Sequence, residues 1–77
     1  EVNLYIEHTD KACIEVMLRF FRETDLKILN MGIIRSDRSE KHNACAIFTL
    51  RLKKGTNQEE LMDHIRAIAG VVSVRQL

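Results

Sequence analysis

The start of the first predicted helix holds the residues best suited to bind a small ligand. Thr9 and Asp10 precede this helix, and Lys11 and Ala12 lie in its first turn. Amides at a helix N-terminus lack partners within the helix, and with the helix dipole they attract carboxylates. The second predicted strand contains Gly32, and a glycine inside a strand marks a bulge or a close approach by a ligand or another backbone. This strand can therefore complete the site from a neighbouring sheet or subunit. The predicted ligand-binding residues are Thr9, Asp10, Lys11, Ala12, Asn30 and Gly32, although a capped helix and a strand bulge explain the same residues.

Histidines and cysteines are the other residues with chemistry of their own. No two of the histidines His8, His42 and His64 have the i, i+4 spacing of a helical metal site, and we expect them at the surface. Cys13 and Cys45 form no CxxC pair and lie in apolar runs, which predicts buried free thiols in a reducing compartment. A metal site assembled from these residues by tertiary contacts stays open as an alternative.

Motifs for catalysis and for nucleic-acid binding are not found. The sequence has no glycine-rich phosphate loop and no serine–histidine motif, so we expect no enzyme activity, no catalytic residue and no cofactor. Its 12 basic and 11 acidic residues give a net charge of +1, and the longest basic run is the pair Lys53 and Lys54. This balance argues against a nucleic-acid partner. No apolar stretch reaches the roughly 18 residues of a membrane span.

The elements that position these residues follow from hydrophobic periodicity. Alternation predicts a strand over Val2–His8, with Val2, Leu4 and Ile6 on one side. A helix is predicted over about 11–23, with a broad apolar stripe that suggests a contact outside the domain. The next predicted strand covers 26–35, with Leu29, Met31 and Ile33 on one face and Ile28, Asn30, Gly32 and Ile34 on the other.

The second half of the chain repeats this pattern of elements. Residues 36–43 are polar and predict a hairpin loop, followed by a strand over 44–52 that alternates regularly. Thr56 or Asn57 caps a second helix, since each has a glutamate three residues further on. Leu61, Ile65 and Ile68 form its buried stripe, and Gly70 occupies the predicted C′ position before a last strand over 71–77.

This order of elements predicts one α+β domain over residues 1–77. The βαββαβ order gives a ferredoxin-like, four-stranded antiparallel sheet with two helices on one face. The strands carry apolar residues on both faces, so one set needs cover from outside the domain. We therefore expect a homodimer, or contact with the rest of a longer parent protein from which this domain derives.

The chain resembles an ACT domain over essentially its whole length. The resemblance rests on the order of elements, on the Asp10-Lys11 turn and on the ending from Ile68 to Val74, which is similar to the family's x-x-G-V-x-x-V pattern. It implies a regulatory or dimerisation module. ACT domains that bind amino acids usually have a glycine shortly after the first-turn aspartate, but Ala12 and Cys13 occupy that place here.

Within this group, the sequence is similar to the C-terminal cytoplasmic domains of MgtC/SapB family membrane proteins. The similarity rests on the runs 46–52, 59–61 and 70–74. It implies a cytoplasmic domain of a bacterial inner-membrane protein linked to magnesium transport or homeostasis, attached to the membrane only through a parent transmembrane region. The alternatives are an amino-acid-sensing ACT domain of a metabolic or stringent-response enzyme, and a metal-binding domain.

Overall fold

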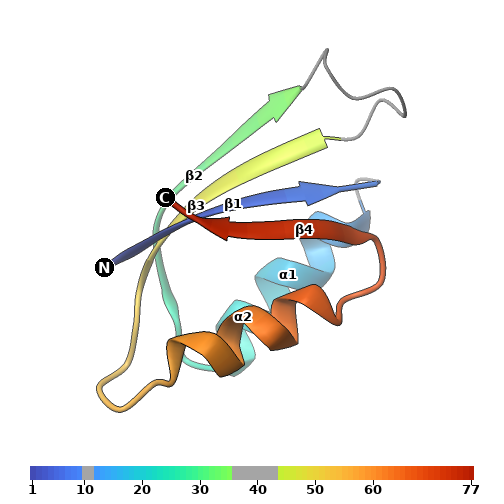
Figure 1. The fold of residues 1–77 in the computed structure, drawn as a ribbon. Helices are drawn as coiled ribbons and strands as arrows, with labels where there is room; N and C mark the ends of the chain where they lie inside the picture. Colours follow the sequence, from blue (N-terminus) through green and yellow to red (C-terminus); the bar gives the residue numbers. More distant parts are fainter. Residues whose placement is uncertain (10–11, 36–43) are drawn as a thin grey trace.

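Four strands and two helices follow one another in the predicted βαββαβ order (Figure 1). The computed structural model describes residues 1–9, 12–35 and 44–77, so the predicted loop over 36–43 lies outside the described residues. The sheet has the order β2-β3-β1-β4, and all neighbouring strands are antiparallel. The elements are β1 (Val2–His8), α1 (Ala12–Glu23), β2 (Lys27–Arg35), β3 (Ala44–Arg51), α2 (Gln58–Arg66) and β4 (Val71–Gln76).

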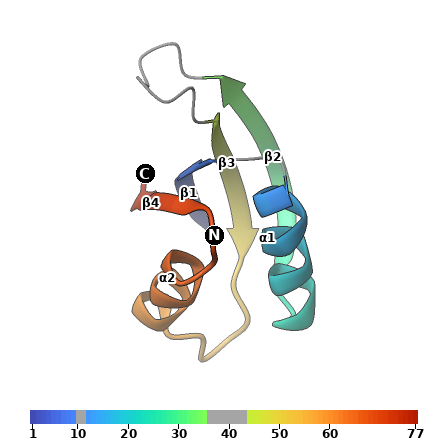
Figure 2. The ribbon, with the colours of Figure 1, turned by 90° about the vertical axis from the view of Figure 1, so that its right-hand side faces the viewer.

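The core lies between the sheet and the two helices, which cover the same face. α1 lies on the β2 side of the molecule and α2 on the β4 side (Figure 2). The alternating residues of β1 and β3 supply the sheet's half of the core, as their period of two predicts. The fully buried side chains include Leu4, Ile6, Met17, Phe21, Phe48, Leu50 and Ile65. Neither helix among the described residues has the length and apolar character needed to cross a membrane.

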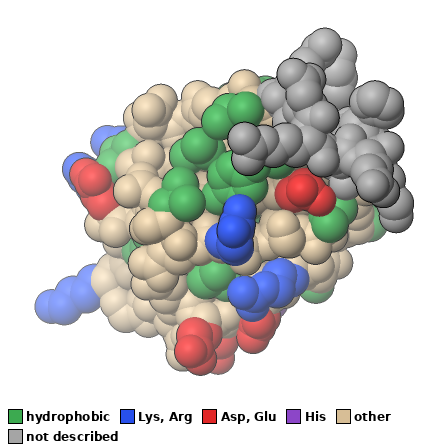
Figure 3. Space-filling view, turned by 45° about the horizontal axis from the view of Figure 1, so that its top comes forward, with side chains coloured by type: hydrophobic (Ala, Val, Ile, Leu, Met, Phe, Trp, Pro, Cys, Tyr) green, Lys and Arg blue, Asp and Glu red, His purple; other side chains and the backbone are tan. Residues whose placement is uncertain are grey.

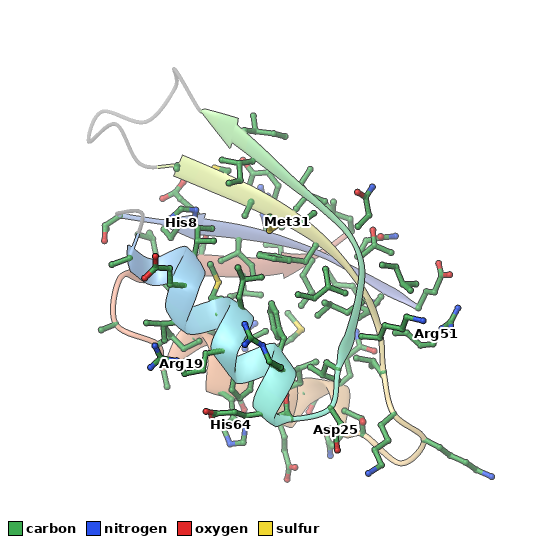
Figure 4. All side chains as sticks on the ribbon, turned by 180° about the vertical axis from the view of Figure 1, so that it is seen from behind. His8, Arg19, Asp25, Met31, Arg51 and His64 are labelled. Atoms are coloured by element: carbon green, nitrogen blue, oxygen red, sulfur yellow. The ribbon has the colours of Figure 1, made fainter. Side chains whose placement is uncertain are left out.

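A Schellman motif ends α1 and turns the chain into β2. The Leu26 amide donates to the Phe21 carbonyl at 2.9 Å, and the Asp25 amide donates to the Arg22 carbonyl at 3.3 Å. Asp25 takes the left-handed position with a φ of 58°, where glycine is the usual residue (Asp25 is labelled in Figure 4). Leu26 and Phe21 are both buried, which supplies the hydrophobic contact that accompanies this motif.

A bulge in β2 changes which residues share a face. The pairing with β3 shifts between Ile28 and Asn30, so Leu29 is the extra residue. Ile28 consequently lies on the helix side together with Met31 and Ile33, opposite Leu50 and the inward-facing residues of β3. The predicted placement of Ile28 with Asn30 and Gly32 is therefore wrong, because a bulge reverses the alternation. Gly32 itself sits in the regular ladder, paired with Ile47.

Asn57 caps the N-terminus of α2, and Gly70 lies beyond the C′ position that was predicted for it. The Asn57 side-chain oxygen accepts from the Glu60 amide at 3.1 Å. The helix ends at Arg66, with Ala67 as its C-cap, so Gly70 is not the C′ residue. Gly70 has a φ of 94° and forms the sharp turn into β4 instead.

Candidate functional site

The junction between β1 and α1 is held by the turn before β4. The Thr9 amide donates to the Gly70 carbonyl at 2.8 Å. A Cβ on Gly70 would lie 3.2 Å from the Thr9 Oγ1 atom and 3.5 Å from the Cys13 side chain, so any larger residue would crowd Thr9 at this approach. Ala12 is the first residue of α1 and is exposed. Asp10 and Lys11 lie outside the described residues.

The other two predicted ligand residues lie elsewhere on the sheet. Asn30 pairs with Thr49, which in turn pairs with Asn3, whereas Thr9 follows the opposite end of β1. Six residues of strand separate these positions, about 20 Å at about 3.3 Å per residue. Gly32 is exposed, and no atom lies within 4 Å of the position of an added Cβ. One chain therefore does not bring Asn30 and the β1–α1 junction together, and a joint site requires a second molecule.

The histidines and cysteines separate into buried and exposed groups. His8 is only 1% exposed, so the expectation that the histidines lie at the surface is wrong for this residue. The signal was present in the sequence, because His8 continues the inward alternation of Val2, Leu4 and Ile6. His64, labelled in Figure 4, is exposed. The centre of its ring lies 6.0 Å from the centre of the Phe20 ring in an edge-on contact.

Both cysteines are buried and free, as predicted. The described part of the chain holds no group of three or more histidine, cysteine and carboxylate side chains placed to bind a metal ion. His42 lies outside the described residues, so the metal-binding alternative stays a hypothesis without a described site.

β2 is an open sheet edge with apolar side chains on both faces. Met31 and Ile33, on the helix side, are 40% and 57% exposed, and Ile34, on the other side, is 46% exposed (Met31 is labelled in Figure 4). Backbone groups of successive residues point to opposite sides of a strand. The Leu77 amide donates to the Asn3 carbonyl, which fixes the alternation of backbone groups across the sheet. By that alternation Gly32 faces Ile47 of β3, so Met31 and Ile33 direct their backbone groups to the open edge. The Met31 amide donates to the Asn30 Oδ1 atom at 2.9 Å, so one of these edge donors has a partner.

A groove runs beside the open edge, between α1 and the start of β2. Its volume is about 340 Å³. Apolar side chains dominate its lining, and two basic residues stand at its rim, where α1 ends and β2 begins. It is lined by Leu18, Arg22, Leu26, Lys27 and Ile28. Leu18 lies in the broad apolar stripe that was predicted to serve a contact outside the domain.

The face of the sheet opposite the helices is covered by none of the described elements. Figure 3 views the molecule from this side and shows hydrophobic side chains next to basic and acidic ones. The Arg75 guanidinium lies 5.2 Å from the centre of the Tyr5 ring. A hydrogen bond with Cys45, with a smaller contribution from burial, raises the pKa of Tyr5 above its usual 10.0. Fewer apolar residues of β2 lie on this face than the sequence predicted, because the bulge at Leu29 places Ile28 on the helix side.

Comparison with known proteins supports the fold. Neither family models nor curated proteins give a match. Among solved structures, the ACT domain of a GTP pyrophosphokinase from Chlorobium tepidum is similar, with a TM-score of 0.75 and 18% identity. The match covers 99% of this chain and 95% of that chain. This chain therefore has an ACT-like fold, as its sequence predicted, while the similarity to MgtC/SapB proteins stays a hypothesis.

The structure adds one feature that the sequence did not locate, namely which strand carries the unprotected apolar surface. The sequence predicted apolar residues on both faces of the second strand but did not place the exposed ones at a sheet edge. The crossover rules for a βαββαβ chain put that strand at an edge, so the signal lay in the topology and not in local composition.

Proposed function

We propose that this chain is an ACT-like regulatory module that works as a homodimer, with the β2 edges of two copies paired. The observation that carries the proposal is the edge surface formed by Met31, Ile33 and Ile34. Long, open, apolar edge strands are templates for pairing, and proteins normally blunt them with charge, proline, a bulge or a covering element. β2 has a bulge at Leu29, but residues 30–34 beyond it pair regularly with β3 and include neither charge nor proline.

The energetics favour a second copy as the cover. Two antiparallel β2 strands related by a two-fold axis extend the four-stranded sheet to eight strands and satisfy the outward backbone groups. Removing a side chain such as Met31 or Ile33 from water contributes about 1.5–3 kcal/mol when burial is complete. The groove beside α1 continues the same apolar surface, so the partner's edge and helix have a place to pack.

The proposed pairing also allows the predicted ligand residues of two copies to form one site. Asn30 and Gly32 lie on the pairing strand, and the two-fold axis brings them towards a second molecule. A ligand carboxylate at the β1–α1 junction, near Thr9 and Ala12, would then contact residues of both copies. We propose this shared site for a small carboxylate ligand such as an amino acid.

Two kinds of parent protein fit such a module. The structural neighbour is part of a GTP pyrophosphokinase, which favours an amino-acid-sensing domain of a metabolic or stringent-response enzyme. The sequence similarity described above favours the cytoplasmic domain of an MgtC/SapB-type protein linked to magnesium homeostasis. The place of the family's glycine is filled by Ala12 and Cys13, and this difference supports the second parent. In either protein the module regulates and does not catalyse.

The oligomeric state tests the dimer. Sedimentation equilibrium should give a dimer for the unaltered chain, and Ile33→Lys should weaken dimerisation by about 30-fold or more, since at least about 2 kcal/mol of apolar burial is lost. Ile33 is 57% exposed in the single chain, so its fold tolerates the change. Val16→Lys is the matched control, because Val16 is 43% exposed but belongs to α1. A monomeric unaltered chain, or equal dissociation constants for the two variants, would contradict the proposal.

Thermal unfolding against a panel of amino acids and divalent metal ions separates the parent types. A ligand that binds only the folded state raises the melting temperature in proportion to the logarithm of its concentration. A rise with one amino acid supports the sensor, and its loss in Ile33→Lys would show that the site needs both copies. A dimer that responds to no compound supports the association module of a membrane protein.

A further inference from the structure

The second sheet edge is formed by β4, which among the described strands pairs only with β1. The Leu77 amide donates to the Asn3 carbonyl at 2.8 Å, so the backbone of Leu77 faces β1. Because backbone groups alternate along an antiparallel strand, Arg75 and Ser73 also face β1. Val74 and Gln76 therefore direct their amides and carbonyls to the open edge, where an added strand can bind them.

A groove on the flank of α2 that faces away from α1 reaches this edge at Gln76, the last residue of β4. Its volume is about 470 Å³. The lining residues are Gln58, Glu59, Met62, Asp63, Arg66 and Gln76. A free strand edge beside a helix is the arrangement in which several domains bind an extended peptide as an extra strand.

The charges of the groove select for a basic side chain. The Arg66 guanidinium lies 2.9 Å from the Asp63 carboxylate, so these two charges offset one another. Glu59 belongs to no ion pair among the described residues, and its carboxylate gives the groove a negative end. Met62 is partly buried against the core and offers an apolar contact between the polar side chains.

We propose that the groove between α2 and the β4 edge binds an extended peptide segment, which adds to β4 as a fifth strand and places a lysine or arginine side chain at Glu59. This site is separate from the β2 edge and does not depend on the proposed dimer. A second copy of the chain fits less well here, because its own α2 would meet a flank that is polar except for Met62. A peptide gains its affinity from backbone hydrogen bonds and has no such helix to accommodate.

Amide hydrogen exchange of the isotope-labelled chain tests the site. The probe is a synthetic octapeptide of alternating valine and threonine with one central lysine, compared with the same peptide carrying glutamate at that position. With the lysine peptide, exchange at Val74 and Gln76 should slow about tenfold or more as the edge amides gain partners. The amides of Ser73 and Arg75 should change little, since they already face β1. The lysine peptide should bind about fivefold more tightly than the glutamate peptide, and salt should reduce the difference.

Two pairs of variants supply the controls. Gln76→Pro removes an amide that faces the open edge and leaves the hydrogen bonds to β1 in place, and proline is tolerated in an edge strand. Gln76→Pro should therefore weaken peptide binding. Gln76→Ala keeps the amide and should not. Glu59→Gln should remove the preference for lysine. Glu60→Gln should retain it, because Glu60 lies on the α1 side of the same helical turn, in a groove with Phe20 and His64.

Three results would overturn the proposal. The first is unchanged exchange at Val74 and Gln76 at millimolar concentrations of either peptide. The second is protection that rises with protein concentration in the absence of peptide, which would assign the edge to a second copy. The third is equal binding by Gln76→Pro and Gln76→Ala, which would place the peptide away from the strand edge. None of these results bears on the β2 dimer, which Ile33→Lys tests separately.

Discussion

Replacing Gly70 with alanine tests how closely the turn before β4 is fitted to the β1–α1 junction. Gly70 has a φ of 94°, a conformation that costs a residue with a Cβ about 1–2 kcal/mol. Alanine has less conformational entropy than glycine in the unfolded chain, which offsets about 0.4–1 kcal/mol of this cost. The added Cβ would also lie 3.2 Å from the Thr9 Oγ1 atom, and crowding of this kind costs about 1 kcal/mol or more. We expect Gly70→Ala to destabilise the domain by about 2 kcal/mol.

Gly55 provides the matched control for this measurement. It has a φ of 88°, and no atom lies within 4 Å of an added Cβ. Gly55→Ala therefore carries the backbone penalty without the contact, and it should cost about 1 kcal/mol less than Gly70→Ala. Urea unfolding followed by circular dichroism gives both free energies. In a domain of this size, a difference of 1 kcal/mol corresponds to about 4–8 °C in melting temperature.

A double-mutant cycle with Thr9 isolates the contact itself. Thr9→Ala removes the Oγ1 atom that the new methyl group would crowd, so Gly70→Ala should cost about 1 kcal/mol less in that background. The hydrogen bond from the Thr9 amide to the Gly70 carbonyl is present in every variant and cancels. Equal costs for Gly70→Ala and Gly55→Ala, with no coupling to Thr9, would refute the view that the junction is held by this close approach.

The remaining predictions concern the ends of the helices and one tyrosine. At the end of α1, Asp25→Gly should be more stable than Asp25→Ala by about 1 kcal/mol in urea unfolding, because the position is left-handed; the reverse order would show that the aspartate side chain matters more than its φ of 58°. Asn57→Ala should cost about 1 kcal/mol through loss of the cap on the Glu60 amide, whereas Asn57→Asp should retain most of the stability; equal losses would argue against a capping role. The Tyr5 phenol should titrate above pH 10.0 in ultraviolet difference spectra, and Cys45→Ala should lower that value; an unchanged titration would remove the hydrogen bond as the cause. Since the folded pKa is raised, the stability linked to Tyr5 is present below pH 10.0 and is lost as the pH rises through the folded value.

Much of the fold was predictable because hydrophobic periodicity and helix caps are local signals. The alternation of β1 located its bounds and its buried side, and the glutamates three residues after Thr56 and Asn57 located the start of α2 to within one residue. The bulge at Leu29 had no such signal, because leucine has no special backbone preference. The glycine that suggested a bulge, Gly32, stands in a regular pair, and one unsignalled residue changed the face assigned to Ile28.

The candidate sites were harder to predict because they depend on register and on strand order. The sequence named Thr9 and Asn30 as parts of one site completed from a neighbouring sheet or subunit, and the strand register adds that within one chain they lie near opposite ends of the sheet. The burial of His8 follows from its inward position in the alternation of β1, and the chemistry of the histidine side chain gives no sign of it. The β4 groove was not predicted, since neither its backbone groups nor its lining forms a sequence pattern.

The presence of two open edges on one sheet bears on how an assembly of this chain ends. Pairing through β2 alone gives a closed dimer, because a two-fold axis uses the same edge of each copy. The eight-stranded sheet that results is bounded on both sides by β4. If β4 also paired with β4 of another dimer, the sheet would grow without limit into a fibre. In the proposed dimer, the polar flank of α2 and the exposed Arg75 and Gln76 would prevent such growth and would leave the outer edges open to the proposed peptide.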